Sequence, residues 1–317
     1  MKKVLGGLFI FLVLAITAVF IFIPAQLHIS AMAAIKANVN PLSKYLSDEA
    51  KWAKWWPHES DEKQLINQNN HLQLNKFTYQ LTKKLYNSAE VQITRKGQII
   101  NSKIFIIPLA DDSLIVQWQS AFKTSLNPFT RISQYQEAVN IKKNMTVILN
   151  SLKSFGENKE KVYTFPIYLT TLKDTFYISE KTVTTGYPSI QVIYKLIENL
   201  RTYISAQKAK AGDFPILNIT KKDSLHYTTM VAIPVDRILD GNGNIAFKRM
   251  IVYQDKILSA DVKGGPGKIE EAHDALNTYI KDYNLTVPVI GWETLITDRS
   301  KETDSTKWIT KICVPIA

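Results

Sequence analysis

Glu293 is the residue whose type and position most suggest chemistry. It lies in "GWETLIT", residues 291 to 297, and aligning "WETLIT" with the earlier "PILNIT" places Glu293 opposite Ile216. One stretch therefore has a carboxylate where the other has an apolar side chain. An ionised carboxylate inside a strand is costly unless it is paired or near water. Glu293 is thus either a solvated carboxylate at a sheet edge, or a cleft acid that attracts a cationic ligand or acts as a general acid or base.

Aromatic rings near this carboxylate would favour a lipophilic cation, because a cation is attracted both by a ring face and by a negative charge. The candidate ligand-binding residues beside Glu293 are Tyr168, Tyr177, Tyr187, Tyr253 and Trp308. Side chains alternate between the two faces of a strand, so we expect Trp292 on the face opposite Glu293. Each of these aromatic residues could equally belong to a core.

Other patterns with chemical potential are incomplete. The run "DGNGN" begins like a calcium loop, but Ile245 and Ile251 stand where such a loop needs glycine and glutamate. The turn "GGPG" lacks the Lys and Ser/Thr of a phosphate loop. Cys313 has no histidine nearby in the sequence, which makes it a poor nucleophile. We expect neither a metal nor a cofactor, since metal-ligand spacing is also absent among the five histidines, His28, His58, His71, His226 and His273.

The composition is that of a globular protein with a basic surface. The chain has 317 residues, 45% of them hydrophobic and 21% charged, with a formal net charge of +11 and a pI near 9.4. This length suits two ordinary domains, and a single cysteine cannot form an internal disulfide. The lysines are dispersed and no helix-turn-helix, zinc-finger or basic-helix pattern occurs, so we expect no nucleic-acid partner. The charge suits either an anionic membrane surface or plain solvation.

The N-terminal sequence predicts a membrane segment. Residues 4–23 contain no charge, and 20 residues at 1.5 Å each span about 30 Å of hydrocarbon. Lys2 and Lys3 precede the segment, so the positive-inside rule keeps the N-terminus in the cytoplasm and sends residues 25–317 across the membrane. A signal peptide cleaved after the A-x-A at Ala31 to Ala33 is the alternative, but the apolar run is longer than a usual signal core.

The next part of the chain predicts an antiparallel sheet followed by a long helix. An apolar stripe at helical spacing places that helix at 137–155. A shorter amphipathic helix is expected just before Pro57. Alternating patterns place strands at 26–37, 88–97, 98–109 and 112–122.

Tryptophans are concentrated at the end of the short helix. Trp52, Trp55 and Trp56 fall at i, i+3 and i+4, which is one helix face. We expect them to close one end of the sheet against the long helix. Together with Trp118, in the last strand, they form either a core corner or the wall of an apolar cavity.

This order of elements resembles the START-like superfamily, also called SRPBCC or polyketide-cyclase-like. The residues that carry the resemblance are "VNPLSKYLSDEAKWAKWWP", "SLNPFTRISQY" and "NIKKNMTVILNSLKSFGE", and it covers residues 26–156. The resemblance implies a helix-grip fold, in which a curved sheet wraps the long helix and leaves an apolar cavity. It selects neither a ligand nor a reaction. The polar run "GENKEK", residues 156–161, is the best domain boundary.

The second half contains an internal repeat, with units at about 165–236 and 246–317. Each unit predicts a strand, a glycine turn, a helix and two strands. The arrangement resembles the GyrI-like effector-binding fold of bacterial multidrug-responsive regulators, over residues 160–317. It is most specific in "YIKDYNLTVPVIGWETLITD" and "DSTKWITKICVPI". The resemblance implies a ligand cleft between the units with an acid at Glu293. Some members are hydrolases, and Glu293 with Tyr253 could fill their catalytic roles.

The sequence therefore predicts an α+β protein in three parts: a transmembrane anchor at 1–25, a helix-grip antiparallel domain at 26–156, and a duplicated effector-binding domain at 160–317. We expect a single-pass protein of a bacterial inner membrane, with residues 25–317 in the periplasm, that binds or senses a small, largely apolar molecule, including a cationic one. No DNA-binding domain accompanies the effector fold. The alternatives are a hydrolase of an electrophilic small molecule that uses Glu293, and a scaffold with a protein partner in the envelope.

Overall fold

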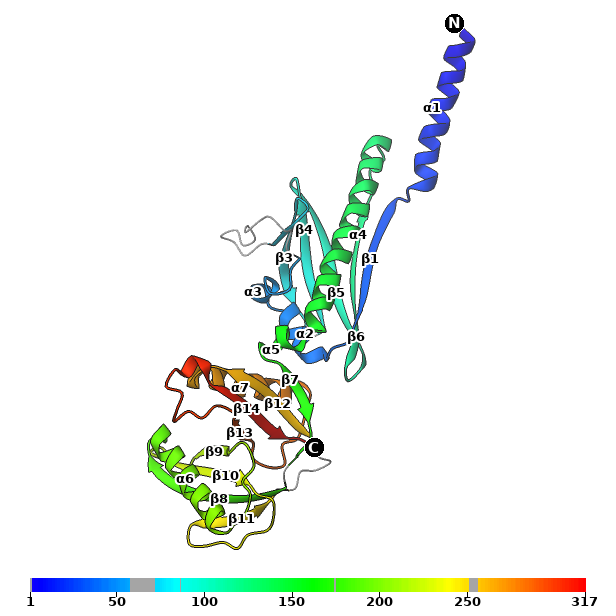
Figure 1. The fold of residues 1–317 in the computed structure, drawn as a ribbon. Helices are drawn as coiled ribbons and strands as arrows, with labels where there is room; N and C mark the ends of the chain where they lie inside the picture. Colours follow the sequence, from blue (N-terminus) through cyan, green and yellow to red (C-terminus); the bar gives the residue numbers. More distant parts are fainter. Residues whose placement is uncertain (1, 58–71, 86, 174, 251–255) are drawn as a thin grey trace. The chain divides into compact units, whose positions relative to one another are not determined.

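The chain forms a mixed α+β structure with two antiparallel sheets, as the sequence predicts. The structure, a computed structural model, describes residues 2–317 apart from 58–71, 86, 174 and 251–255, with side chains from Gly6 onward. Two compact units divide it, Met1–Asn158 (unit 1) and Lys159–Ala317 (unit 2). Each contains one of the sheets (Figure 1).

The first helix of unit 1, α1 (Lys2–Phe22), covers most of the predicted membrane segment. Its side chains are largely exposed from Leu8 to Phe22. Within the described part of the chain, no helix is both long and apolar enough to cross a membrane. Just after α1, the guanidinium of Arg131 donates two hydrogen bonds to the Ile23 carbonyl, from Nε at 2.9 Å and Nη2 at 2.6 Å.

The sheet of unit 1 packs against one long helix, α4 (Pro128–Gly156). The predicted apolar stripe is buried in α4, but the helix begins nine residues earlier than expected, at Pro128, where the Asn127 side chain caps it. The sheet order is β1-β6-β5-β4-β3-β2. The strands are β1 (Gln26–Ile35), β2 (Leu72–Leu74), β3 (Phe77–Lys84), β4 (Ser88–Arg95), β5 (Gln98–Ala110) and β6 (Ser113–Lys123).

The tryptophan segment is not one helix, contrary to the sequence prediction. It forms α2 (Val39–Leu46) and the short α3 (Glu49–Trp52), while Trp55 and Trp56 follow in a turn. The break has a local cause, because Ser47 ends α2 and the Asp48 side chain caps α3 by accepting from the Ala50 amide.

Unit 2 contains an eight-stranded sheet built from two similar halves, β8-α6-β9-β10 and β12-α7-β13-β14. Its strand order is β11-β8-β10-β9-β13-β14-β12-β7. The strands are β7 (Ile167–Thr170), β8 (Phe176–Thr185), β9 (Ile216–Lys221), β10 (His226–Pro234), β11 (Ile245–Arg249), β12 (Ile257–Lys263), β13 (Trp292–Leu295) and β14 (Ile309–Pro315). The helices are α5 (Lys159–Tyr163), α6 (Ile190–Ala206), α7 (Pro266–Asp282) and the 3-10 turn η2 (Ser305–Lys307).

The two halves exchange their leading strands. β7 precedes the first half in sequence but pairs with β12 of the second, and β11 precedes the second half but pairs with β8 of the first. At the centre the halves join through β9 and β13, where Glu293 lies opposite Leu217 and Thr294 opposite Ile216. Neither half therefore completes its part of the sheet without the other.

Candidate functional site

Glu293 lies on the helix-covered face of the unit 2 sheet, and its charge is already compensated. Its carboxylate is 3.3 Å from Nη2 of Arg299 and 3.4 Å from Nε2 of His273, which comes from α7. The Glu293 side chain is only 12% exposed and that of Arg299 only 9%. Glu293 is therefore a paired, mostly buried carboxylate, and a cationic ligand would have to compete with Arg299 for it.

Arg299 occupies the position expected for a ligand cation. Its guanidinium lies over the Trp308 ring, 4.9 Å from the centroid, and its Nη2 donates to the Thr310 hydroxyl at 2.7 Å. Its Nε is buried and has no hydrogen-bond partner in the described part of the chain. The carboxylate, the aromatic face and the cation of the predicted site are thus all present, but the cation belongs to the protein.

The predicted site residues divide between the two faces of the sheet. Tyr187 lies close enough to Glu293 for the carboxylate charge to act on its hydroxyl. Desolvation, followed by the charge of Glu293, raises the pKa of Tyr187. The residue is nevertheless 66% exposed. Trp308 shares this face through Arg299. Trp292 lies on the opposite face, as alternation predicts, together with Tyr177. Tyr253, the hydroxyl partner of the hydrolase hypothesis, lies outside the described residues, and that hypothesis stays a prediction.

Two partners of Glu293, Arg299 and His273, were not predicted from the sequence. Arg299 is six residues after Glu293, beyond the end of β13, and only the fold of the following loop returns its side chain to the strand. His273 lies on α7 and meets Glu293 because the helix packs on the neighbouring strands β12 and β14. Neither contact leaves a spacing pattern in the sequence.

The opposite face of the sheet contains two adjoining cavities, of about 410 and 470 Å³. Tyr177, Ile216 and Trp292 line both, and we call the pair the sheet-face cavities. These three residues belong to a buried apolar cluster that is separate from the cluster beneath α6. Ile216 is followed by Leu217, which packs under α6, so strand alternation turns Ile216 away from the helices.

The two cavities differ in character. The 470 Å³ cavity is mainly apolar, with Met230, Ala232, Val289 and Ile290 among its lining residues. The 410 Å³ cavity also has polar groups, including Thr294 and Lys311. The same cavity is lined by Cys313, whose thiol has its pKa raised by burial, in line with the expectation that it is a poor nucleophile.

The tryptophans of unit 1 form a packed cluster. Trp52 and Trp56 stack with centroids 5.7 Å apart, and Trp56 contacts Tyr79, which in turn contacts Trp118 edge-on. The Trp55 carbonyl accepts from Ser151 of α4 at 2.7 Å. The cluster therefore joins the sheet to the long helix, as expected from the sequence, and all four rings are at most 3% exposed. That they also line an open cavity stays a prediction.

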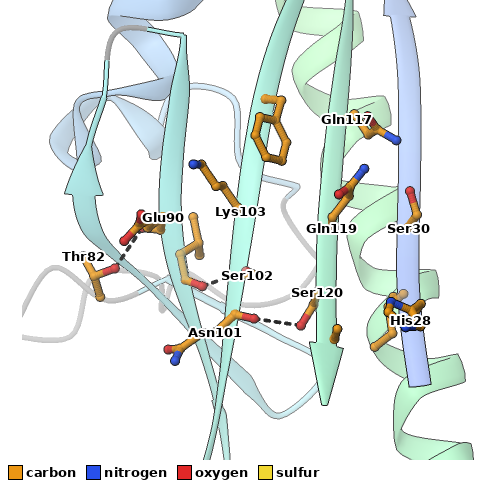
Figure 2. Close-up of a pocket in the computed structure, with 14 residues that line it drawn as sticks. His28, Ser30, Thr82, Glu90, Asn101, Ser102, Lys103, Gln117, Gln119 and Ser120 are labelled. Atoms are coloured by element: carbon orange, nitrogen blue, oxygen red, sulfur yellow. Dashed lines mark hydrogen bonds between the residues drawn. The ribbon is translucent and has the colours of Figure 1, made fainter. Parts of the chain in front are cut away.

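A cavity of about 770 Å³ in unit 1 has a polar lining instead (Figure 2). Figure 2 shows its labelled side chains spread over β1, β3, β4, β5 and β6. On β6, Gln117 and Gln119 alternate with the buried Trp118 and so point away from the tryptophan cluster. Two short hydrogen bonds join neighbouring strands beside this cavity, from Ser102 to the Val91 carbonyl at 2.7 Å and from Ser120 to the Asn101 carbonyl at 2.8 Å. This composition is normal for the solvated face of an antiparallel sheet.

Comparisons with known proteins find distant likenesses to solved structures. No family model matches the chain. No curated protein matches it either. Similar solved structures are the EcmrR C-terminal domain (16% identity, TM-score 0.41, 48% of this chain and 98% of that one) and SAV2435 bound to tetraphenylphosphonium (18%, 0.34, 48% and 94%). A third is the Zhui aromatase/cyclase from Streptomyces sp. R1128 (12%, 0.32, 42% and 94%).

These neighbours include effector-binding, GyrI-like proteins and an SRPBCC-like aromatase/cyclase, the two groups that the sequence resembles. At such identities and TM-scores they decide neither the ligand nor the reaction.

Proposed function

We propose that this chain is a membrane-anchored binding or sensing protein for a small, largely apolar molecule, which unit 2 holds in the sheet-face cavities. The observation that carries the proposal is the apolar lining shared by the two cavities. Ile216 and Trp292 are 7% and 8% exposed, yet each lines both cavities. Cavities of 410 and 470 Å³ are within the usual range of small-molecule sites, roughly 300–1,000 Å³.

A cationic ligand is supported less well than a neutral or anionic one. At the Glu293 position, Arg299 already supplies the cation. Among the described residues that line the sheet-face cavities, the only carboxylate is Asp213. Cation binding therefore requires either displacement of Arg299 or recognition by a single exposed carboxylate.

Filling the apolar cavity should abolish binding. We expect a small, neutral, apolar diazirine photolabel to modify peptides that contain Ile216 and Trp292 in the full-length protein. The substitution Ala232→Phe places a phenyl ring in the 470 Å³ cavity and should remove most of that labelling. Peptide mass spectrometry after photolysis makes the measurement.

The matched control is Ala206→Phe, which adds the same ring at the exposed end of α6 and should leave the labelling unchanged. Equal labelling of the wild type and Ala232→Phe would contradict the proposal. So would labelling confined to α1.

We also propose that α1 anchors the chain, with residues 25–317 in the bacterial periplasm. The support is the band of exposed apolar side chains on α1, including Phe9 at 67%, Phe11 at 70% and Ile21 at 72%, which would be unfavourable in water. The uncharged run after Lys2 and Lys3 supports the orientation.

The full chain should accordingly stay with membranes after alkaline carbonate washing. In intact cells it should resist added protease, and it should become sensitive once the outer membrane is permeabilised. Extraction by carbonate would contradict the anchor, and protection that persists until the inner membrane is lysed would contradict the orientation. An intact mass that lacks the first 30 or so residues would support a cleaved signal peptide.

A further inference from the structure

Trp292 differs from every other tryptophan of the chain in its hydrogen bonding. Each of the other five donates its indole N–H to a protein acceptor, over 2.8 to 3.4 Å. Within the described residues, the Trp292 N–H has no partner, although the residue is only 8% exposed. The Trp292 Nε1 is not among the fully buried side-chain atoms that lack a partner, and the residue lines both sheet-face cavities, so this N–H is available to a bound molecule that carries an acceptor.

The charged groups around Trp292 are mostly positive. Four basic residues line the sheet-face cavities, and none makes an ion pair with a described residue: Lys173, Lys248, Arg249 and Lys311. Lys311 is the nearest of them in register, because Trp292 pairs with Cys313 and Thr294 with Lys311 on the same sheet face. Asp261 of β12 stands directly opposite Lys311, so a bound anion competes with this carboxylate for the lysine. Diagonal neighbours of this kind lie about 7–8 Å apart. A lysine ammonium and an indole N–H can therefore meet the same head group.

The more polar and the more apolar cavity of the site lie next to each other on the same face of the unit 2 sheet. Trp292 lines both cavities and Lys311 lines the 410 Å³ one. The adjoining 470 Å³ cavity is lined mainly by apolar side chains such as Met230, Val289 and Ile290, with Lys248 and Arg249 also in its lining. A molecule with one charged end and one apolar chain fits this order, with its chain beneath Trp292.

From these observations we infer that the sheet-face cavities bind an amphiphile with a single anionic head group, carboxylate or phosphate. The head group accepts the Trp292 N–H and pairs with Lys311, and the apolar chain occupies the 470 Å³ cavity. This inference rests on the proposed function and names its ligand class. It departs from the cationic ligand that the sequence resemblance implies.

The test uses photoreactive probes that share one twelve-carbon chain with a terminal diazirine and differ only in the head group. The head groups are carboxylate, phosphate monoester, alcohol and trimethylammonium. In the full chain we expect the two anionic probes to label the peptides around Met230 and residues 286–291, and the other two to label them about tenfold less. Stronger labelling by the carboxylate probe would identify a fatty acid as the ligand, and stronger labelling by the phosphate probe a phospholipid-like molecule.

Two substitutions assign the recognition. Lys311→Met should reduce labelling by the anionic probes about tenfold and leave the alcohol probe unchanged, whereas Lys195→Met, at an exposed position of α6, should change neither. Trp292→Phe keeps a ring but removes the donor, and should also reduce anionic labelling. If its folding fails, Lys311→Met still decides the question.

The outcomes separate the inference from the proposed function. Equal labelling by the alcohol, trimethylammonium and anionic probes, unaffected by Lys311→Met, would overturn the anionic head group and leave an apolar site standing. Absence of cavity labelling by all four probes would overturn both.

Discussion

Replacing Trp52 with alanine is expected to lower the unfolding free energy of unit 1 by about 3–5 kcal/mol. Trp52 has no exposed surface, stacks on Trp56, and donates its indole N–H to the Leu46 carbonyl at 2.8 Å. The substitution removes that packing, leaves a cavity between the α2–α3 segment and the sheet, and deprives the Leu46 carbonyl of its donor.

Hydrogen exchange of the slowest amides in β5 and β6, measured in the full chain, reports this loss for unit 1 alone, with the amides of β10 as an internal reference. Phe129→Ala is the control, because Phe129 is 78% exposed and its loss should change stability by less than about 0.5 kcal/mol. A Trp52→Ala protein whose β5 and β6 amides exchange like those of the control would show that the cluster contributes little to stability.

Replacing Arg299 with methionine is expected to destabilise unit 2 by about 3–5 kcal/mol, because it leaves the buried carboxylate of Glu293 with His273 as its only described charged partner. The double substitution Glu293→Gln with Arg299→Met removes both charges and should recover most of that loss. Together with the single variant Glu293→Gln, these two complete a double-mutant cycle that measures the coupling between the two charges. Amide exchange in β13 and β14 gives the free energies.

Lys268→Met is the matched control for this pair. Lys268 and Glu271 also form an ion pair, at 2.6 Å, but their side chains are 56% and 54% exposed, so its loss should cost less than about 1 kcal/mol. Suppose that Arg299→Met lowers the unfolding free energy no more than Lys268→Met does. The Arg299–Glu293 pair then contributes little to stability, and a ligand cation could displace Arg299 from Glu293.

Much of the secondary structure of unit 1 could be predicted because its signals are local. β1 alternates buried and exposed residues throughout, and the stripe from Ile141 to Phe155 repeats at helical spacing. The first turns of α4 lack such a stripe, so its start at Pro128 could not be predicted from periodicity. The break between α2 and α3 depends on caps at Ser47 and Asp48, which compete with continuous apolar spacing.

In the candidate site, only the features that follow from the alternation of side chains along a strand could be predicted from the sequence. The opposite orientation of Glu293 and Trp292 follows from their adjacency in a strand, and the structure confirms it. The partner of Glu293 comes from a loop, and the sheet-face cavities form where β9, β10, β13 and β14 curve beside one another. Such long-range placement has no signature in any short stretch of sequence.

The exchange of β7 and β11 also determines the order in which unit 2 can fold. Ile167 of β7 pairs with Ala260 of β12, so this edge of the sheet waits for almost a hundred further residues. The β9–β10 hairpin, by contrast, closes over a short turn. To form a pairing between distant residues, the chain must first lose the conformational entropy of a large loop, before any contact stabilises it. This loss slows folding. During synthesis, β7 therefore stays without its partner until the second half emerges, and during that interval it is an edge open to pairing with another chain.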